Sequence, residues 1–242
     1  MNEAAVTVDR NDALLAWYQE NRRDLPWRRT NEPYPILVSE VMLQQTQVDR
    51  VIPKFDAFME QLPTVGELAS IDTTTLLGLW SGLGYNNRAL RLRSAAVIVD
   101  ANGWPTTAAG LSGLPGVGPY TANAIASISF GEQVAAVDTN LKRVLSRWVG
   151  ISLAGSELQR AASVSLGTPA SEWNQALMDL GSSLCSARAP QCSSCPVELW
   201  CIDPTIYEPP AKQPAFKGSN RELRGAMVRA HVAGEDPHRA GS

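Results

Sequence analysis

Apolar residues recur along most of this chain at the spacing of an α-helix. One stripe over 48–62 consists of Val48, Val51, Ile52, Phe55, Met59 and Leu62, and another over 141–149 consists of Leu141, Val144, Leu145, Trp148 and Val149. Similar runs lie at 90–98 and 173–180. This period of about 3.6 residues is typical of amphipathic helices, whereas a half-buried strand alternates every second residue. We find no confident alternating segment and predict an all-α fold.

Start and stop signals bound several of these helices. Thr46 with Asp49, and Thr64 with Glu67, resemble capping boxes, in which two side chains satisfy the first free backbone N–H groups of a helix. Gly150 directly follows the stripe over 141–149, where a glycine commonly ends a helix. We therefore expect helices to begin near residues 47 and 65 and one to end near 149.

A glycine-rich turn lies at Leu114-Pro115-Gly116-Val117-Gly118-Pro119-Tyr120. Gly116 and Gly118 permit a tight turn, and Pro119 suits the first position of a following helix. Outward N–H groups at such a helix start can bind a DNA phosphate without a charged side chain. The alternative interpretation is an ordinary turn between two helices.

Twenty residues after Gly118 comes Asp138, in the sequence Val137-Asp138-Thr139-Asn140. It directly precedes the helix expected from residue 141, so one interpretation is that its carboxylate caps that helix. The other is that it is a catalytic carboxylate directed at DNA. The turn and the aspartate together are more specific than either alone.

All four cysteines lie within seventeen residues, spaced C-x6-C-x2-C-x5-C: Cys185, Cys192, Cys195 and Cys201. Four such thiolates can enclose one compact metal centre, and close spacing of four cysteines is a known iron–sulfur pattern. A structural zinc usually uses two separated C-x2-C pairs, and only one pair occurs here. Zinc and a pair of disulfides remain the alternatives.

The composition narrows the choice of partners. The chain of 242 residues has a net charge of -3, so a DNA-binding surface must be a local basic patch. No apolar run is long enough to span a membrane, and the N-terminus lacks the pattern of a secretory signal. We expect an intracellular, cytoplasmic, monomeric protein.

Residues 204–242 are rich in proline and then in mixed charge, and we interpret them as a linker and a mobile tail.

These motifs resemble the helix–hairpin–helix glycosylase superfamily. LPGVGPYTA followed by VDTN is similar to its hairpin and downstream aspartate, and the cysteine spacing is similar to the cluster of its endonuclease III and MutY branches. The resemblance covers about residues 10–203. It implies a [4Fe–4S] cluster on the four cysteines and DNA bound across two helical lobes. We assign residues 1–30 and 130–203 to one lobe, and 31–129 with the hairpin to the other.

Two positions indicate the branch within this superfamily. Tyr120 stands where endonuclease III-like enzymes carry a lysine that attacks the sugar, and a tyrosine cannot form that Schiff base. SEVMLQQT resembles the adenine-specific MutY signature, and Glu40 matches its catalytic glutamate. Adenine leaves readily only when a ring nitrogen is protonated, and a carboxyl in the apolar run ILVSEVML is shifted toward the acid form. Asp138 would stay ionised to stabilise the positive sugar, while Tyr120 orients these groups.

The resemblance implies further contacts with duplex DNA and the extruded base. Candidates for the base pocket and the DNA surface are Arg23, Trp27, Arg28, Gln44, Gln45, Tyr85, Gly116, Gly118, Asn140 and Asp179. Tyr85 would wedge into the base stack, and Asp179 would accept a hydrogen bond from the adenine amino group. Arg88, Lys142 and Arg143 are candidate phosphate contacts.

The resemblance predicts a monofunctional adenine glycosylase acting on adenine opposite 8-oxoguanine or guanine. Three features depart from the pattern: Thr139 replaces a common glycine, Asn86 replaces an aromatic residue, and the chain ends before the domain with which many relatives read 8-oxoguanine. One alternative is a glycosylase for mismatched thymine or uracil. Another is a non-catalytic, cluster-bearing DNA-binding protein.

Overall fold

The regular elements of the protein are helical. The computed structural model describes residues 3–206, 209, 215 and 217–235, and no strand occurs among them, so the predicted all-α class is confirmed. The α-helices are α1 (Glu3–Asn21), α2 (Pro33–Leu43), α3 (Val48–Gln61), α4 (Val65–Ser70), α5 (Thr73–Leu79), α6 (Asn87–Asn102), α7 (Ala108–Leu111), α8 (Pro119–Phe130), α9 (Thr139–Val149), α10 (Gly155–Ser165), α11 (Ala170–Ser182) and α12 (Asn220–Val232). Short 3-10 turns are η1 (Pro26–Arg28), η2 (Cys192–Ser194) and η3 (Glu198–Trp200). No helix in the described ranges is both long and apolar enough to cross a membrane.

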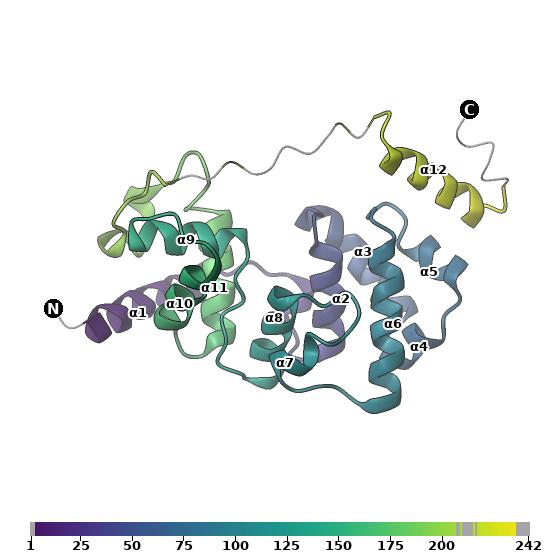
Figure 1. Cartoon of the computed structure of the whole chain (residues 1–242), viewed down its shortest axis with the longest axis horizontal. Helices are drawn as coiled ribbons and strands as arrows, with labels where there is room; N and C mark the ends of the chain where they lie inside the picture. Colours follow the sequence, from purple (N-terminus) through teal and green to yellow (C-terminus); the bar gives the residue numbers. More distant parts are fainter. Residues whose placement is uncertain (1–2, 207–208, 210–214, 216, 236–242) are drawn as a thin grey trace. The chain divides into compact units, whose positions relative to one another are not determined.

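Contacts divide the chain into two compact units, whose helices are labelled in Figure 1. Unit 1 comprises Met1–Asp24, Thr106–Leu111 and Gly118–Pro210, and unit 2 comprises Leu25–Pro105, Ser112–Val117 and Ala211–Ser242. These boundaries differ from the lobes expected from the sequence, because α8 groups with the terminal helices and not with the hairpin turn. The C-terminal segment also groups with unit 2 and is not separate from both.

The core of unit 1 forms where α11 packs against α1 and α9. Leu14, Leu141, Trp173 and Leu177 are fully buried in it. Helix α9 carries the apolar stripe expected from the sequence, and it ends at Gly150, whose φ of 80° is left-handed. A side chain there would meet Ile202, since an added Cβ would lie 2.6 Å from Ile202 Cγ2. The predicted stop signal is therefore confirmed, and its glycine is required by both backbone and space.

Unit 2 tests the two predicted capping boxes, and only one forms. Thr64 and Glu67 cap α4 reciprocally, as expected. Helix α3 does begin at Val48, but its cap residue is Gln47 and no side chain caps it. The Thr46 hydroxyl is engaged elsewhere, because it accepts a hydrogen bond from Arg88 at 3.1 Å. A tertiary contact has displaced the local one.

The glycine-rich turn lies between α7 and α8. Gly116 has a φ of 81°, and an added Cβ there would lie 2.9 Å from Arg91 Cβ, so this position requires glycine. Gly118 caps α8 with ordinary extended backbone, and Pro119 occupies the first turn of the helix as predicted. The exposed Gly118 leaves open space at the helix start.

The expected mobile tail contains a helix. Residues 220–232 form α12, which packs against α5 within unit 2 (Figure 1). Its mixed composition gave no clear stripe in the sequence. Residues 236–242 of the expected tail lie outside the described residues.

Candidate catalytic and cluster sites

Asp138 caps helix α9 and is also the best-placed candidate carboxylate of unit 1. Its Oδ1 accepts from the N–H of Leu141 at 2.7 Å, and its Oδ2 accepts from Asn140 Nδ2 at 2.9 Å. Burial raises the pKa of this carboxyl, whereas the hydrogen bonds from Leu141 and Asn140 and the charge of Arg143 oppose that rise. The helix-capping interpretation is therefore confirmed, whereas the catalytic one stays a prediction. The expected polar surroundings are present, but burial outweighs them.

A chain of hydrogen bonds joins Asp138 to the first cysteine. Asn140 Oδ1 accepts from Arg143 Nη2 at 2.8 Å, and Arg143 Nε donates to the carbonyl of Cys185 at 2.9 Å. Arg143 Nη2 also donates to the carbonyl of Gly181 at 2.6 Å. An added Cβ on Gly181 would lie 2.7 Å from Asn140 Cβ, so α9 and α11 approach closely here. Asn140 and Arg143 thus support the carboxylate, while the DNA contacts expected of these two half-buried residues stay a prediction.

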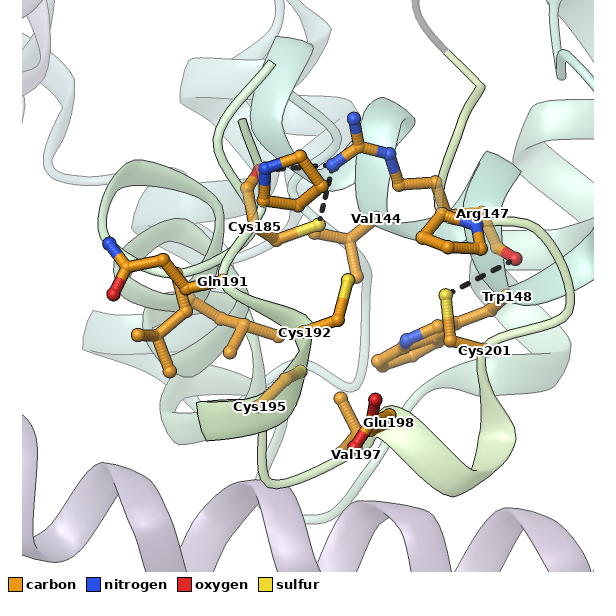
Figure 2. A pocket seen from close by; sticks show the side chains of 14 residues that line it. Val144, Arg147, Trp148, Cys185, Gln191, Cys192, Cys195, Val197, Glu198 and Cys201 are labelled. Atoms are coloured by element: carbon orange, nitrogen blue, oxygen red, sulfur yellow. Dashed lines mark hydrogen bonds between the residues drawn. The ribbon is translucent and has the colours of Figure 1, made fainter. Parts of the chain in front are cut away.

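The four cysteines line a single cavity of about 160 Å³, and Figure 2 shows their side chains around this space. One water molecule needs only about 10–15 Å³ of such volume. The cavity therefore offers more than about ten times the space of one water molecule. In the described ranges, no group of three or more potential ligands is close enough to hold a single metal ion, and all four thiols are free of disulfides. Four thiols around one cavity have the chemistry to hold a thiolate-ligated metal centre.

The electrostatics of the cavity also fit a metal centre. Burial raises the pKa of the Cys195 thiol. Burial, with repulsion from the other three thiols, raises the pKa of Cys201 to about 11. Four thiolates that line one cavity repel one another, and a cationic metal centre would remove that repulsion.

Arg147 is the main support of the cysteine loop, and sequence reasoning did not identify it. It is 1% exposed, and its Nη1 donates to Cys185 Sγ at 3.1 Å (Figure 2). It also donates to the carbonyls of Ser186 at 2.9 Å, Ala187 at 3.0 Å and Ile206 at 3.0 Å. The signal that would have found it is an arginine within the apolar stripe of α9, since a buried charge needs several partners.

Glu40 lies in unit 2, on helix α2. The residues from Ile36 to Met42 are all buried, and Glu40 itself is 8% exposed. The sequence expectation of a carboxyl in apolar surroundings is therefore met. Met42 and Val41 beside it are almost completely buried.

Two irregular loops of unit 2 present the residues expected to meet the base stack. Gln45 and Tyr85 have φ values of 58° and 48°, a left-handed conformation that is rare outside glycine. Such strain is found mainly at functional sites. Tyr85 is 41% exposed, so it does not belong to the core of unit 2.

Arg88 is not a phosphate contact, contrary to the sequence expectation. Its Nη1 donates to the carbonyls of Val41, Met42 and Gln44 at 2.8, 2.9 and 2.6 Å. Its Nη2 donates to Thr46 Oγ1 and to the carbonyls of Leu83 and Gly84, each at 3.1 Å. The guanidinium is 9% exposed and both of its terminal nitrogens are engaged. Arg88 therefore holds the two loops together from inside.

The buried Asp179 forms an ion pair with the partly exposed Arg23 in unit 1. Arg23 Nε and Nη2 each lie 2.6 Å from Asp179 Oδ1, and the backbone N–H of Arg23 donates to Oδ2 at 3.2 Å. The Asp179 side chain is only 3% exposed. Its carboxylate therefore holds Arg23 in place, and a hydrogen bond from adenine to Asp179 stays a prediction.

The remaining candidates are divided between the units. Trp27, in unit 2, is 7% exposed and stacks edge-on with Phe55, which places it in the core, while Arg28 is half-buried. In unit 1, Tyr120 is half-buried in the first turn of α8, and its hydroxyl contacts Met178 Sδ at 3.7 Å. Lys142 is half-buried on α9.

Comparison with known protein families defines the class to which this fold and these sites belong. Residues 38–165 match the family described as "HhH-GPD superfamily base excision DNA repair protein". This match spans the hairpin, Glu40 and Asp138. The chain belongs to this superfamily.

Curated relatives narrow the likeness further. The chain is 40% identical to the adenine DNA glycosylase of Mycobacterium tuberculosis over 93% of this chain and 79% of the relative. It is 44% identical to the human adenine DNA glycosylase over 82% of this chain and 40% of the human protein. A solved thermostable thymine-DNA glycosylase superposes with a TM-score of 0.75 at 29% identity, covering 81% of this chain and 97% of that one.

Proposed function

We propose that this protein is a base-excision-repair glycosylase that releases adenine from mispairs with 8-oxoguanine or guanine. The observation that carries the proposal is the held carboxylate of Asp138, twenty residues after the hairpin, in a chain whose relatives are adenine glycosylases. The buried Glu40 at the matching MutY position supplies the second carboxyl. Its substrate places it inside the cell and in contact with duplex DNA, and we expect it to act as a monomer.

The proposed reaction is hydrolysis of the N-glycosidic bond. Glu40 gives its proton to a ring nitrogen of adenine, the bond to the sugar breaks, and its electron pair leaves with the base. The ionised Asp138 stabilises the positive sugar, as the second carboxylate does in glycoside hydrolysis. Water then adds its oxygen to the sugar carbon and passes its proton to a carboxylate. Tyr120 offers no amine, so strand cleavage does not follow.

The cofactor in this proposal is a [4Fe–4S] cluster held by Cys185, Cys192, Cys195 and Cys201. The cavity volume and the four thiol donors that line the cavity support it. Such a centre would supply structural cross-linking of the loop, since binding to ligands that converge only on folding stabilises the fold. Arg147 would hold this loop and hydrogen-bond one ligand sulfur.

The experiment is a single-turnover assay on a panel of duplexes, with abasic sites revealed by alkali. We expect adenine release opposite 8-oxoguanine and guanine, none opposite thymine, and no cleavage without alkali. Glu40→Gln should lower the rate about 10²–10⁴-fold, because it removes the proton donor. Asp138→Asn should lower it at least about 10²-fold.

Two control variants match these substitutions. Glu60→Gln changes an exposed glutamate of α3, and Asp72→Asn changes another aspartate that caps a helix, α5. Neither should change the rate. If Asp72→Asn lowers the rate as much as Asp138→Asn does, the effect belongs to lost capping and the catalytic role is wrong.

A second candidate is removal of mismatched thymine, favoured by the likeness to a thymine-DNA glycosylase. Thymine and uracil opposite guanine therefore belong in the panel. Thymine release that survives Glu40→Gln, with no adenine release, would establish this candidate instead.

A further inference from the structure

Unit 2 contains a groove of about 950 Å³ that is separate from the cysteine cavity. One wall consists of the two loops that carry Gln45 and Tyr85, with Gly116 of the hairpin turn beside them. The other wall is helix α12, through residues that include Arg224, Val228 and Arg229. The groove thus brings the C-terminal helix to the same space as the strained loops.

The charge of this groove is opposite to that of the whole chain. Five arginines line it, namely Arg50, Arg88, Arg91, Arg224 and Arg229, and the described lining residues include no aspartate or glutamate. The chain as a whole has 24 acidic and 21 basic residues. Arg88 is buried, but the other four are exposed. A groove lined by one sign of charge attracts a polyanion, and this is the local basic patch that an acidic chain needs to bind DNA.

Helix α12 is docked by its apolar side. Ala230 is 5% exposed, and an added Cβ on Gly78 of α5 would lie 3.5 Å from Val232 Cγ1, an ordinary van der Waals contact. Met227 and Val228 are half-buried, while Arg224 and Arg229 are exposed. The helix therefore packs on α5 and still presents two cations to the groove.

We propose that α12 is a second wall of the DNA-binding groove, and that Arg224 and Arg229 contact phosphates of the bound duplex. The opposite wall presents amide and aromatic side chains, Gln45 and Tyr85, which suit base contacts, whereas α12 presents guanidinium groups, which suit phosphates. The partner chemistry is therefore a base-bearing polyanion. This inference rests on the proposed function, because it extends the DNA surface of the same enzyme.

The test is the salt dependence of binding to an undamaged duplex, measured by fluorescence anisotropy on the full, cluster-loaded chain. Each phosphate contact contributes about 0.9 to the slope of log K against log salt. Arg224→Gln and Arg229→Gln should each reduce the slope by about 0.9, and the double variant by about 1.8, with affinity lowered on the order of tenfold. Arg160→Gln, at an exposed arginine of α10, is the matched control and should leave the slope unchanged. Slopes of the α12 variants equal to that of the control would overturn the proposal.

A second variant distinguishes two roles of α12: it either binds DNA as a wall of the groove or blocks access to Gln45 and Tyr85. Ala230→Glu should undock α12 from α5, because it places a charge at a buried contact. If α12 is a wall, this variant binds duplex more weakly. If α12 covers Gln45 and Tyr85, undocking makes binding tighter, and the proposal is wrong. Circular dichroism and thermal melting of the full chain would verify that the rest of the protein stays folded.

Binding and base release are measured separately, so the two proposals fail separately. A natural chain that binds duplex through Arg224 and Arg229 but releases no adenine would contradict the proposed function alone. A chain that releases adenine at the natural rate, with salt slopes unchanged in all α12 variants, would contradict only the assignment of α12.

Discussion

Each unit of the molecule uses a buried arginine to hold irregular backbone, and the two cases differ instructively. In unit 2, Arg88 donates to five backbone carbonyls and one hydroxyl, so all six acceptors are oxygen atoms of α2 and of the loops that carry Gln45 and Tyr85. In unit 1, Arg147 donates to the carbonyls of the cysteine loop and to Cys185 Sγ, but this loop surrounds a cavity of about 160 Å³.

The difference teaches how each loop is stabilised. Backbone that is neither helix nor strand must find other partners for its carbonyls, and a guanidinium with five donors can serve several at once. Around Arg88 these bonds join the end of α2 to two loops of unit 2. Around Arg147 they orient a loop whose thiols still need a centre to bind, so folding of this region should depend on the cofactor.

The largest effect should follow from Arg147→Met, which tests whether the cysteine loop of unit 1 needs this arginine to hold its cofactor. The substitution leaves several buried carbonyls and one ligand sulfur without their donor, and each buried group left unsatisfied costs about 1–3 kcal/mol. We expect loss of most of the bound iron and sulfide, in addition to a lower melting temperature. Arg147→Lys is the control for charge, and it should rescue little, because an ammonium cannot reach all these acceptors.

Iron and sulfide content per chain and the visible absorbance of the cluster report this result. If Arg147→Met retains its full iron content and the melting temperature of the natural chain, Arg147 is not needed to hold the cluster. The comparison between the two arginines would then fail.

The next largest effect should come from Arg88→Met, which tests the arginine that holds the loops of Gln45 and Tyr85. We expect the free energy of unfolding to fall by about 3 kcal/mol or more, since several carbonyls lose a donor together. Iron content should not change. Urea denaturation and iron analysis together separate the two arginines, and loss of iron in this variant would contradict their independence.

The sequence predicted much of the fold through short-range signals. The stripe of α9, its cap at Asp138 and its end at Gly150 all follow from helix periodicity and local backbone chemistry. The capping box at Thr64 and Glu67 is local in the same way. These features need only neighbours a few residues away, and a one-dimensional pattern contains them.

The features that the sequence did not predict depend on distant partners. The carbonyls bound by Arg88 include those of Val41 and Gln44, more than forty residues earlier, so an expected phosphate contact proved to be internal. The hydroxyl of Thr46 accepts a hydrogen bond from the same arginine and does not cap α3 as expected. Helix α12 was missed because its apolar residues make sense only against α5. Arginine in particular is ambiguous, since the same side chain serves a surface or a buried carbonyl cluster.

The smallest and most specific effect should come from Asn140→Ala, which weakens the link between Asp138 and Arg143. The hydrogen bond from Asn140 lowers the pKa of Asp138, against the rise caused by burial. Its loss should therefore raise that pKa further. Because the proposed reaction needs ionised Asp138, activity falls as the pH drops through this pKa, and the acid limb of the single-turnover rate should move to higher pH.

The same substitution should also change how the free energy of unfolding depends on pH. A carboxyl with a raised pKa in the folded state binds its proton more tightly than in the unfolded chain, so stability falls as the pH rises between the two values. Asn140→Ala should thus cost about 1 kcal/mol near neutral pH and less in acid. Asn123→Ala is the matched control, because Asn123 Nδ2 donates to the carbonyl of Ala135 at 2.8 Å and not to a carboxylate. A shift of the acid limb in both variants would mean that the link to Asp138 is not its cause.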